Sequence, residues 1–229
     1  MPSAKQRARR LLLLTLLFEG GLGAVALLLG WIVGHSPLTG LAAERFGAWE
    51  QGAAILWGAL AALPLVAGLL LAERAPGAGW TRLRDLVTHR LVPLFRQMSV
   101  VQFALISLAA GWGEELLFRG LLQAGLAERL QFPGGGWLAL LTASVLFGLC
   151  HWLTHTYALL ATLVGLYLGI LLMATDQILV PITAHSLYDF LALVYLVHWP
   201  ARSDERAGEE QIGEEQTGEE QTGEEQTGE

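Results

Sequence analysis

Long apolar segments are the feature that most constrains how this chain can fold. Residues 11–34 form an apolar run of about 24 residues that contains one acidic side chain, Glu19. About 20 such residues suffice for a helix to cross the hydrocarbon core of a bilayer. Further spans are expected near residues 53–72, 98–128, 137–154, 157–174 and 177–199. The sequence therefore predicts an all-α fold, a polytopic transmembrane bundle of about six to eight helices.

Composition and charge support this prediction and suggest an orientation. The chain is 53% hydrophobic and only 15% charged, whereas soluble domains are about 25% charged. Basic residues collect before the first span, between the second and third spans, and after the sixth. Positive loops face the cytoplasm, so both termini are predicted to be cytoplasmic. The first span is too long for a cleaved signal peptide and is expected to be retained.

We divide the chain into three parts. Residues 1–97 are predicted to form an N-terminal transmembrane hairpin and a basic cytoplasmic loop, and residues 98–200 a helical core. Residues 201–229 are predicted to be a disordered acidic tail, because a repeated Gly-Glu-Glu-Gln-Thr unit cannot bury a core. Residues 207–229 contain nine glutamates and no basic residue, so residues 1–206 carry 14 basic and 12 acidic side chains, a net charge of +2. A charge this small is no strong nucleic-acid footprint. The tail could still bind a basic protein partner.

Ionisable residues interrupt three of the predicted spans. Glu114 and Glu115 lie in the third, His151 in the fourth, and His185 with Asp189 in the sixth. An ionisable group at bilayer depth costs roughly 2.5–3.5 kcal/mol, so such residues usually serve a function. Three segments with acids and bases together predict one shared polar site inside the membrane.

Helical spacing indicates how these side chains face one another. Glu115 and Arg119 are four residues apart and are predicted to form a buried ion pair that stabilises the helix. Glu114 is rotated by about 100° and is expected to point into the site. The pairs Phe147–His151 and His185–Asp189 also share a face. A carboxylate beside an imidazole can take a proton from water, and a second histidine can donate to a carbonyl oxygen that gains charge.

Other chemistries are less well supported by the spacing. We expect no cofactor, with zinc as the alternative: His151 and His155 are four apart on one predicted helix and could bind a metal with Glu114 or His185. The single cysteine, Cys150, excludes an intrachain disulfide. Glu19 could line the site or reach the head groups, and the sequence does not choose between these roles.

The ordered motifs resemble those of the CAAX protease and bacteriocin-processing family. The family pattern is Glu-Glu-x-x-x-Arg, then Phe-x-x-x-His, then His-x-x-x-Asn or Asp. The matching residues here are Glu114, Glu115, Arg119, Phe147, His151, His185 and Asp189. The resemblance implies an intramembrane endopeptidase in which Glu114 and His151 activate water. It also implies that His185 and the polar residue four positions later, Asp189 in this chain, form the oxyanion site, without a metal.

One departure and two rival functions accompany this resemblance. CAAX-cleaving eukaryotic members have Asn where this chain has Asp189, and an ionised Asp cannot donate to an oxyanion. We therefore expect Asp189 to orient His185.

The expected substrate is a membrane-associated peptide or protein, and the expected location is the bilayer of a prokaryotic plasma membrane. The alternatives are a non-catalytic scaffold or bacteriocin-immunity protein, and a proton-coupled transporter.

Overall fold

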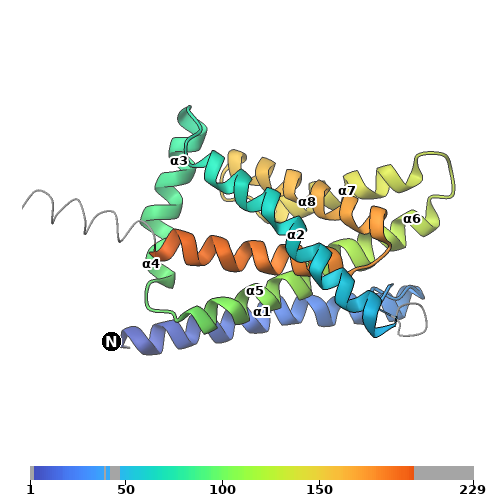
Figure 1. Ribbon diagram of the computed structural model, residues 1–229, viewed down its shortest axis with the longest axis horizontal. Helices are drawn as coiled ribbons and strands as arrows, with labels where there is room; N and C mark the ends of the chain where they lie inside the picture. Colours follow the sequence, from blue (N-terminus) through green and yellow to red (C-terminus); the bar gives the residue numbers. More distant parts are fainter. Residues whose placement is uncertain (1–2, 39, 42–46, 199–229) are drawn as a thin grey trace, which may run out of the picture.

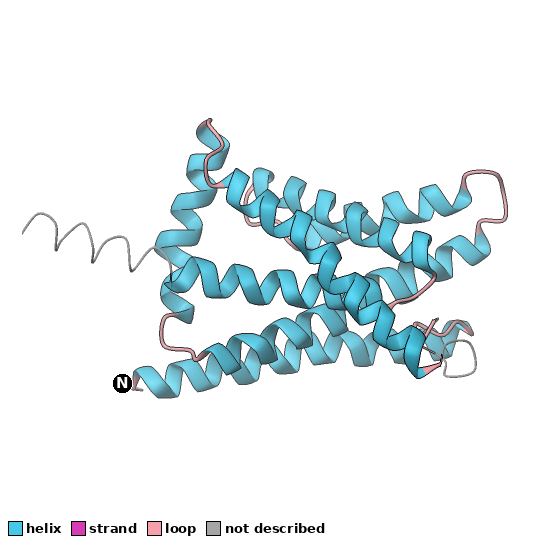
Figure 2. Ribbon diagram, viewed as in Figure 1, coloured by secondary structure: helices cyan, strands magenta, loops and turns pink. Residues whose placement is uncertain are grey.

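The computed structural model describes residues 3–38, 40–41 and 47–198, and these residues form helices connected by short loops, with no strand (Figures 1 and 2). The predicted tail, residues 201–229, lies outside the described residues. Two π-helical stretches, η1 and η2, each join α-helices into a longer rod. The elements in chain order are α1 Ala4–Val33, α2 Ala48–Ala72, α3 Ala78–Leu86, η1 Val87–Leu91, α4 Val92–Phe95, α5 Val100–Glu115, η2 Leu116–Ala124, α6 Gly125–Arg129, α7 Gly135–Cys150, α8 His155–Thr175 and a last helix, Leu179–His198.

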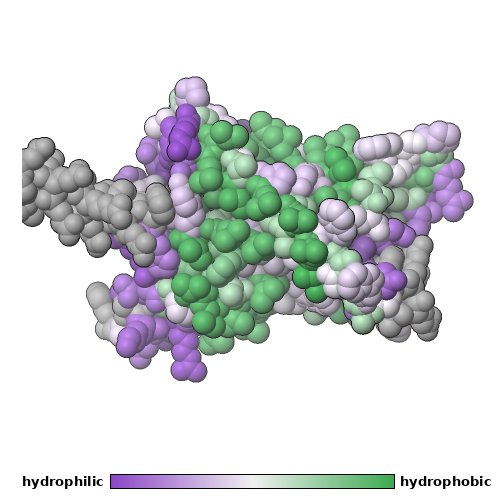
Figure 3. Space-filling view, in the orientation of Figure 1, coloured by the Kyte–Doolittle hydropathy of each residue, from purple (hydrophilic) through white to green (hydrophobic). Residues whose placement is uncertain are grey.

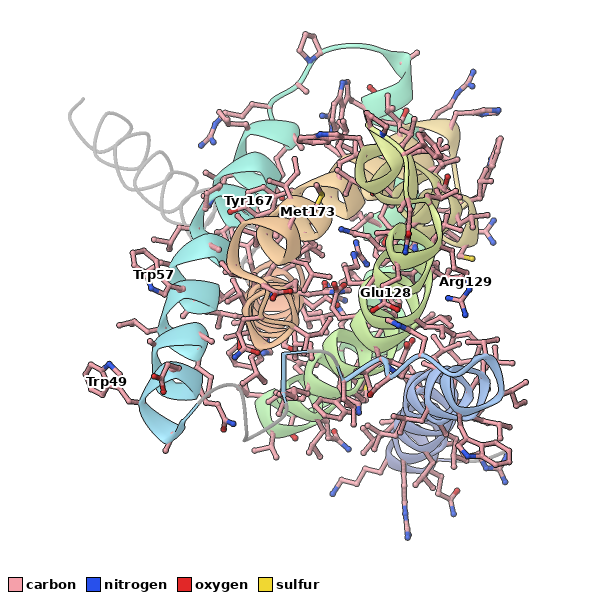
Figure 4. All side chains as sticks on the ribbon, turned by 90° about the vertical axis from the view of Figure 1, so that its right-hand side faces the viewer. Trp49, Trp57, Glu128, Arg129, Tyr167 and Met173 are labelled. Carbon is pink, nitrogen blue, oxygen red and sulfur yellow. The ribbon has the colours of Figure 1, made fainter. Side chains whose placement is uncertain are left out.

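Five of the described helical segments are long and apolar enough to cross a membrane, and α7 is a shorter apolar helix. The predicted helical membrane bundle is thereby confirmed. The space-filling view shows a broad hydrophobic belt with hydrophilic residues at both ends (Figure 3). Many large apolar side chains point outward into this belt, and Trp57 on α2 is one of them (Figure 4). Such an apolar exterior is stable in lipid, and the protein is an integral membrane protein.

Polar caps determine where the helices start. Ser3 and Ser99 each begin a helix with a capping box, in which the serine hydroxyl accepts a hydrogen bond from the backbone N–H of the third residue. Thr154 caps α8 in a similar way through the backbone N–H of Tyr157. Each cap satisfies a backbone donor that the helix itself leaves free. The apolar stretches are therefore divided at these polar residues.

Small residues allow the helices around the site to approach closely. A Cβ on Gly113 of α5 would lie 1.9 Å from the carbonyl oxygen of Glu19 on α1, and a Cβ on Gly111 would lie 2.1 Å from Oγ of Ser186 on the last helix. Gly58 of α2 packs against Thr183 of the last helix. The first two helices thus pack against the core, α1 along α5 and α2 across the last helix (Figure 1).

The third span is a single helical segment from Val100 to Arg129, about 45 Å long at 1.5 Å per residue. A helix of this length exceeds a hydrocarbon core of about 30 Å, so it must tilt, extend beyond the core or break. The helix has no break at Gly111 or Gly113, and both glycines lie at close contacts with neighbouring helices. Instead, the hydrogen bonding becomes π-helical directly after Glu115 and stays so through Ala124. π-Helical turns inside α-helices often mark functional sites.

A polar cluster connects the end of α1 to α6. The buried imidazole of His35 contacts the carboxylate of Glu128 through Nδ1 and the carbonyl of Gly120 through Nε2, each at 2.8 Å. Arg129 donates to the carbonyl of Val33 at 2.9 Å. Glu128 and Arg129 lie at the end of the bundle that faces the viewer in Figure 4. These contacts join α1 to the far end of the rod that carries Glu114 and Glu115.

Candidate active site

The two adjacent glutamates end α5 and are both buried. Oε1 of Glu115 accepts a hydrogen bond from Nη1 of Arg119 at 2.8 Å, inside the protein. Arg119 also donates to the carbonyl of Gly165 on α8 at 3.2 Å, and its guanidinium lies 4.4 Å from the ring centre of Phe147. The structure therefore contains the ion pair that the sequence predicts, and Arg119 extends it to α7 and α8.

Glu114 points to a different face of the helix, toward two histidines. Its Oε2 lies 3.7 Å from Nε2 of His151 and 3.9 Å from Nε2 of His185. This oxygen is buried and accepts no hydrogen bond from a described residue. A buried acceptor of this kind is normally satisfied, so it is available for a small polar molecule. Glu114, His151 and His185 come from three separate helical segments and meet at this point.

The imidazole of His151 is held in one orientation by the backbone. His151 follows the last residue of α7, and its Nδ1 lies 2.8 Å from the carbonyl oxygen of Phe147. Because a carbonyl only accepts hydrogen bonds, Nδ1 carries the proton of this pair. In the neutral ring Nε2 is then an acceptor, and it faces Glu114. Two acceptors 3.7 Å apart can contact one water molecule together.

His185 is held mainly by Glu115. Its Nδ1 donates to Oε1 of Glu115 at 2.8 Å, whereas its Nε2 lies 3.5 Å from Oδ2 of Asp189. The sequence prediction assigned the orienting role to Asp189 and gave Glu115 only the pairing with Arg119. In the structure Glu115 accepts from both Arg119 and His185, while Asp189 flanks the nitrogen that faces Glu114. Spacing along one helix could not reveal a contact between residues 70 positions apart.

Phe147 packs at the centre of the site. Its ring centre lies 4.4 Å from that of His151 and 5.9 Å from that of His185, and it meets Phe118 edge-on at 5.1 Å. With Arg119 on the ring as well, one aromatic side chain contacts four neighbours. Such packing fixes side-chain rotamers, so Phe147 is a support for both imidazoles.

The predicted helix that was to carry both His151 and His155 does not exist. The structure ends α7 at Cys150, and α8 begins at His155 after the cap Thr154. His155 instead packs against Trp152 at 5.1 Å between ring centres. Among residues 3–38, 40–41 and 47–198, no three His, Cys, Asp or Glu side chains form a group arranged to hold a metal ion. The common helical face on which the zinc alternative rested is therefore absent.

Three further residues near the site had no firm role from the sequence. Glu19 on α1 lies beside Glu114 and is close enough to interact with Asp189 and His185. Tyr157 and Tyr188 both interact electrostatically with Asp189, and the ring of Tyr157 lies 6.2 Å from that of His151. Glu19 had a signal in the sequence, because it is an acidic residue inside the first membrane span. The tyrosines carried none, because their spacing matches no motif.

Comparison with known families now adds to this geometry. Residues 96–191 match the family model Rce1-like, described as type II CAAX prenyl endopeptidase Rce1-like. This segment is therefore similar to the Rce1-like family. The resemblance found in the sequence is thus confirmed over less than half of the chain. No curated protein and no solved structure matches the chain.

The Rce1-like segment includes the residues of the candidate site that lie on α5, on α7 and on the last helix. It begins just before α5 and ends within the last helix, so it contains every residue of the three motifs. The family is a protease family, which supports a hydrolase. Helices α1 and α2 precede the segment, and Glu19 therefore lies outside it.

Proposed function

We propose that this protein is an intramembrane endopeptidase of the CAAX-protease type, which hydrolyses a peptide bond in a membrane-associated protein or peptide. One observation carries the proposal. Oε2 of Glu114 is buried, has no hydrogen-bond donor among the described residues, and faces Nε2 of both His151 and His185 within 3.9 Å. That arrangement suits the activation of a water molecule next to a polarised carbonyl group.

The proposed reaction begins with water held between Glu114 and Nε2 of His151. Glu114 takes a proton from the water as its oxygen attacks the carbonyl carbon of the scissile bond. Negative charge then develops on the carbonyl oxygen. The C–N bond breaks when Glu114 returns the proton to the leaving nitrogen, so the carboxyl group ends the cycle in its starting state. No residue is chemically altered at the end of the cycle.

His185 is the proposed donor to the carbonyl oxygen. Its Nδ1 is already used by Glu115, so Nε2 can donate only if the ring is an imidazolium. Glu115 and Asp189 flank the ring and neutralise that charge. Arg119 and Phe147 support this arrangement by holding Glu115 and packing the rings. Asp189 itself need not donate, which agrees with a carboxylate at the position where related proteases have an amide.

The test is cleavage of a library of hydrophobic and lipid-modified peptides by protein purified in detergent. Glu114→Gln should abolish cleavage while the protein stays folded, since the amide cannot accept the proton. Glu50→Gln is the matched control, because it removes an exposed carboxylate from α2. Cleavage that survives a chelator supports metal-free chemistry, whereas loss that added zinc restores supports a metal site.

The rival functions have their own outcomes. If wild-type protein cleaves no peptide and Glu114→Gln keeps its activity in cells, the protein is a scaffold or an immunity protein. Proton flux in vesicles that depends on Glu114 would instead support a transporter. The enzyme proposal is abandoned in either case.

We also propose a prokaryotic plasma membrane as the location, with both termini in the cytoplasm. The exposed basic residues Lys5, Arg9 and Arg10 begin α1, and Arg82, Arg90 and Arg96 lie on or next to α3–α4 at the same end of the bundle (Figure 1). This charge distribution supports the orientation. The acidic repeat is proposed to bind a basic protein partner. Accessibility of terminal tags in spheroplasts tests the orientation.

A further inference from the structure

Glu19 is a carboxyl group in the middle of a membrane-spanning helix. It lies 14 residues before the end of α1 at Val33, which corresponds to about 21 Å along the helix. A side chain at this depth is far from the head groups at either end. Its Oε2 is buried and accepts no hydrogen bond from a described residue. The structure thus favours a role inside the protein over contact with the membrane surface.

The backbone brings Glu19 directly to the site. The carbonyl oxygen of Glu19 occupies the space where Gly113 would otherwise carry a side chain, and Gly23 of α1 packs on the same part of α5. Gly113 immediately precedes Glu114. Any larger residue at position 113 would move α1, and with it Glu19, away from the catalytic glutamate. Two glycines therefore set the distance between the carboxyl groups.

The carboxyl group of Glu19 lies within hydrogen-bonding range of Glu114. Two carboxylates repel each other, whereas a carboxyl group and a carboxylate can share one proton. The charges around the pair also favour one shared proton, because Arg119 and His185 are already bound to Glu115. The titratable and charged groups around the pair are Glu115 on α5, Arg119 on η2, His151 after α7, and His185 and Asp189 on the last helix, with Tyr157 and Tyr188 beyond them.

We propose that Glu19 is a positioning residue of the catalytic centre, which shares one proton with Glu114 and so holds that side chain toward His151. The inference rests on the proposed function for its catalytic meaning. In the resting site one proton lies between the two carboxyl groups. The pair holds two protons after water is deprotonated, and returns to one when Glu114 protonates the leaving nitrogen. Helix α1, outside the Rce1-like segment, thereby becomes part of the active site.

Two substitutions separate hydrogen bonding from simple packing. Glu19→Leu removes the donor, so kcat should fall roughly ten- to a hundredfold with KM unchanged, a loss typical of groups that orient a reacting side chain. Glu19→Gln should keep most of kcat, because its amide can donate to Glu114. The amide cannot release that proton, so the pH profile of kcat should show one ionisation fewer. Glu50→Gln should match the wild type in all three respects.

Infrared spectroscopy tests the shared proton without any substrate. The purified protein should show the carbonyl stretch of a protonated carboxylic acid, which disappears in both Glu19→Gln and Glu114→Gln and persists in Glu50→Gln. A band that is absent, or unchanged in Glu19→Gln, overturns the proposal, as does equal loss of kcat in the Leu and Gln variants. If the Leu variant does not fold, the Gln variant and this band decide. The infrared band tests the shared proton even if the wild type cleaves no peptide. Failure of the protease proposal can therefore be told apart from failure of the shared-proton proposal.

Discussion

The buried pair Glu115–Arg119 allows a quantitative test of how the site is held together. Both side chains are almost completely buried, with 0% and 1% of their surface exposed. Arg119→Met removes the positive charge and leaves Glu115 with His185 as its remaining partner. Breaking a buried ion pair by deleting one member costs about 3–5 kcal/mol. The substitution also removes a donor to the carbonyl of Gly165 and a cation at 4.4 Å from the ring of Phe147.

The expected loss for Arg119→Met is therefore at least about 3 kcal/mol in the free energy of unfolding. An ordinary interhelical hydrogen bond in a membrane protein contributes about 0.6 kcal/mol, so the two cases are easily separated. Reversible unfolding in mixed micelles, followed by circular dichroism, measures this quantity. Arg82→Met on α3 is the control, because Arg82 is exposed and its loss should change stability by less than about 0.5 kcal/mol.

A double-mutant cycle completes this test. Glu115→Gln combined with Arg119→Met removes both charges, so the double variant should lose less than the sum of the single losses, by about 1–3 kcal/mol. Additive losses, or a loss near 0.6 kcal/mol for Arg119→Met, would refute the view that this pair is a buried, mutually dependent unit.

Substitutions at three further positions test helix packing, a buried hydrogen bond and a helix cap. Gly113→Ala should destabilise the protein by about 1–3 kcal/mol and reduce cleavage, because the new methyl group meets the backbone of α1. Thermal unfolding measures the loss of stability. Gly68→Ala is the control and should not destabilise the protein, because nothing lies within 4 Å of a Cβ at that position. His35→Leu should cost about 1–3 kcal/mol by leaving a buried carbonyl without a donor, and a melting temperature equal to the wild type would contradict this. Ser99→Ala should cost about 0.5–2 kcal/mol and Ser99→Asp almost nothing, measured by the same melts; equal losses would exclude a capping role.

The sequence allowed the fold class and the separate motifs to be predicted, because both depend on local patterns. Hydropathy identifies spans of membrane length, and four-residue spacing identifies Glu115–Arg119 as a pair. Neither pattern states how one helix is rotated against another. The contact between Glu115 and His185, and the position of Glu19 beside Glu114, depend on that rotation and became visible only in the structure.

The end of α7 and the π-helical stretch after α5 also could not be predicted from the sequence. Residues 137–154 look like one apolar helix in the sequence, but the chain turns after Cys150, and Thr154 starts the next helix. That turn separates His151 from His155, which the sequence placed on one helical face. The π-helical stretch after Glu115 has no recognised signature in these residues.

The way the site is assembled has a consequence for the synthesis of the protein. Glu115 and Arg119 lie on the same rod, so these two opposite charges enter the bilayer together and compensate each other from the start. His185 and Asp189 are on the last helix and emerge from the ribosome much later. Until then Glu114 faces neither of them. A chain that stops before this helix lacks two of the proposed site residues, so the proposed site is complete only after the last helix has entered the bilayer.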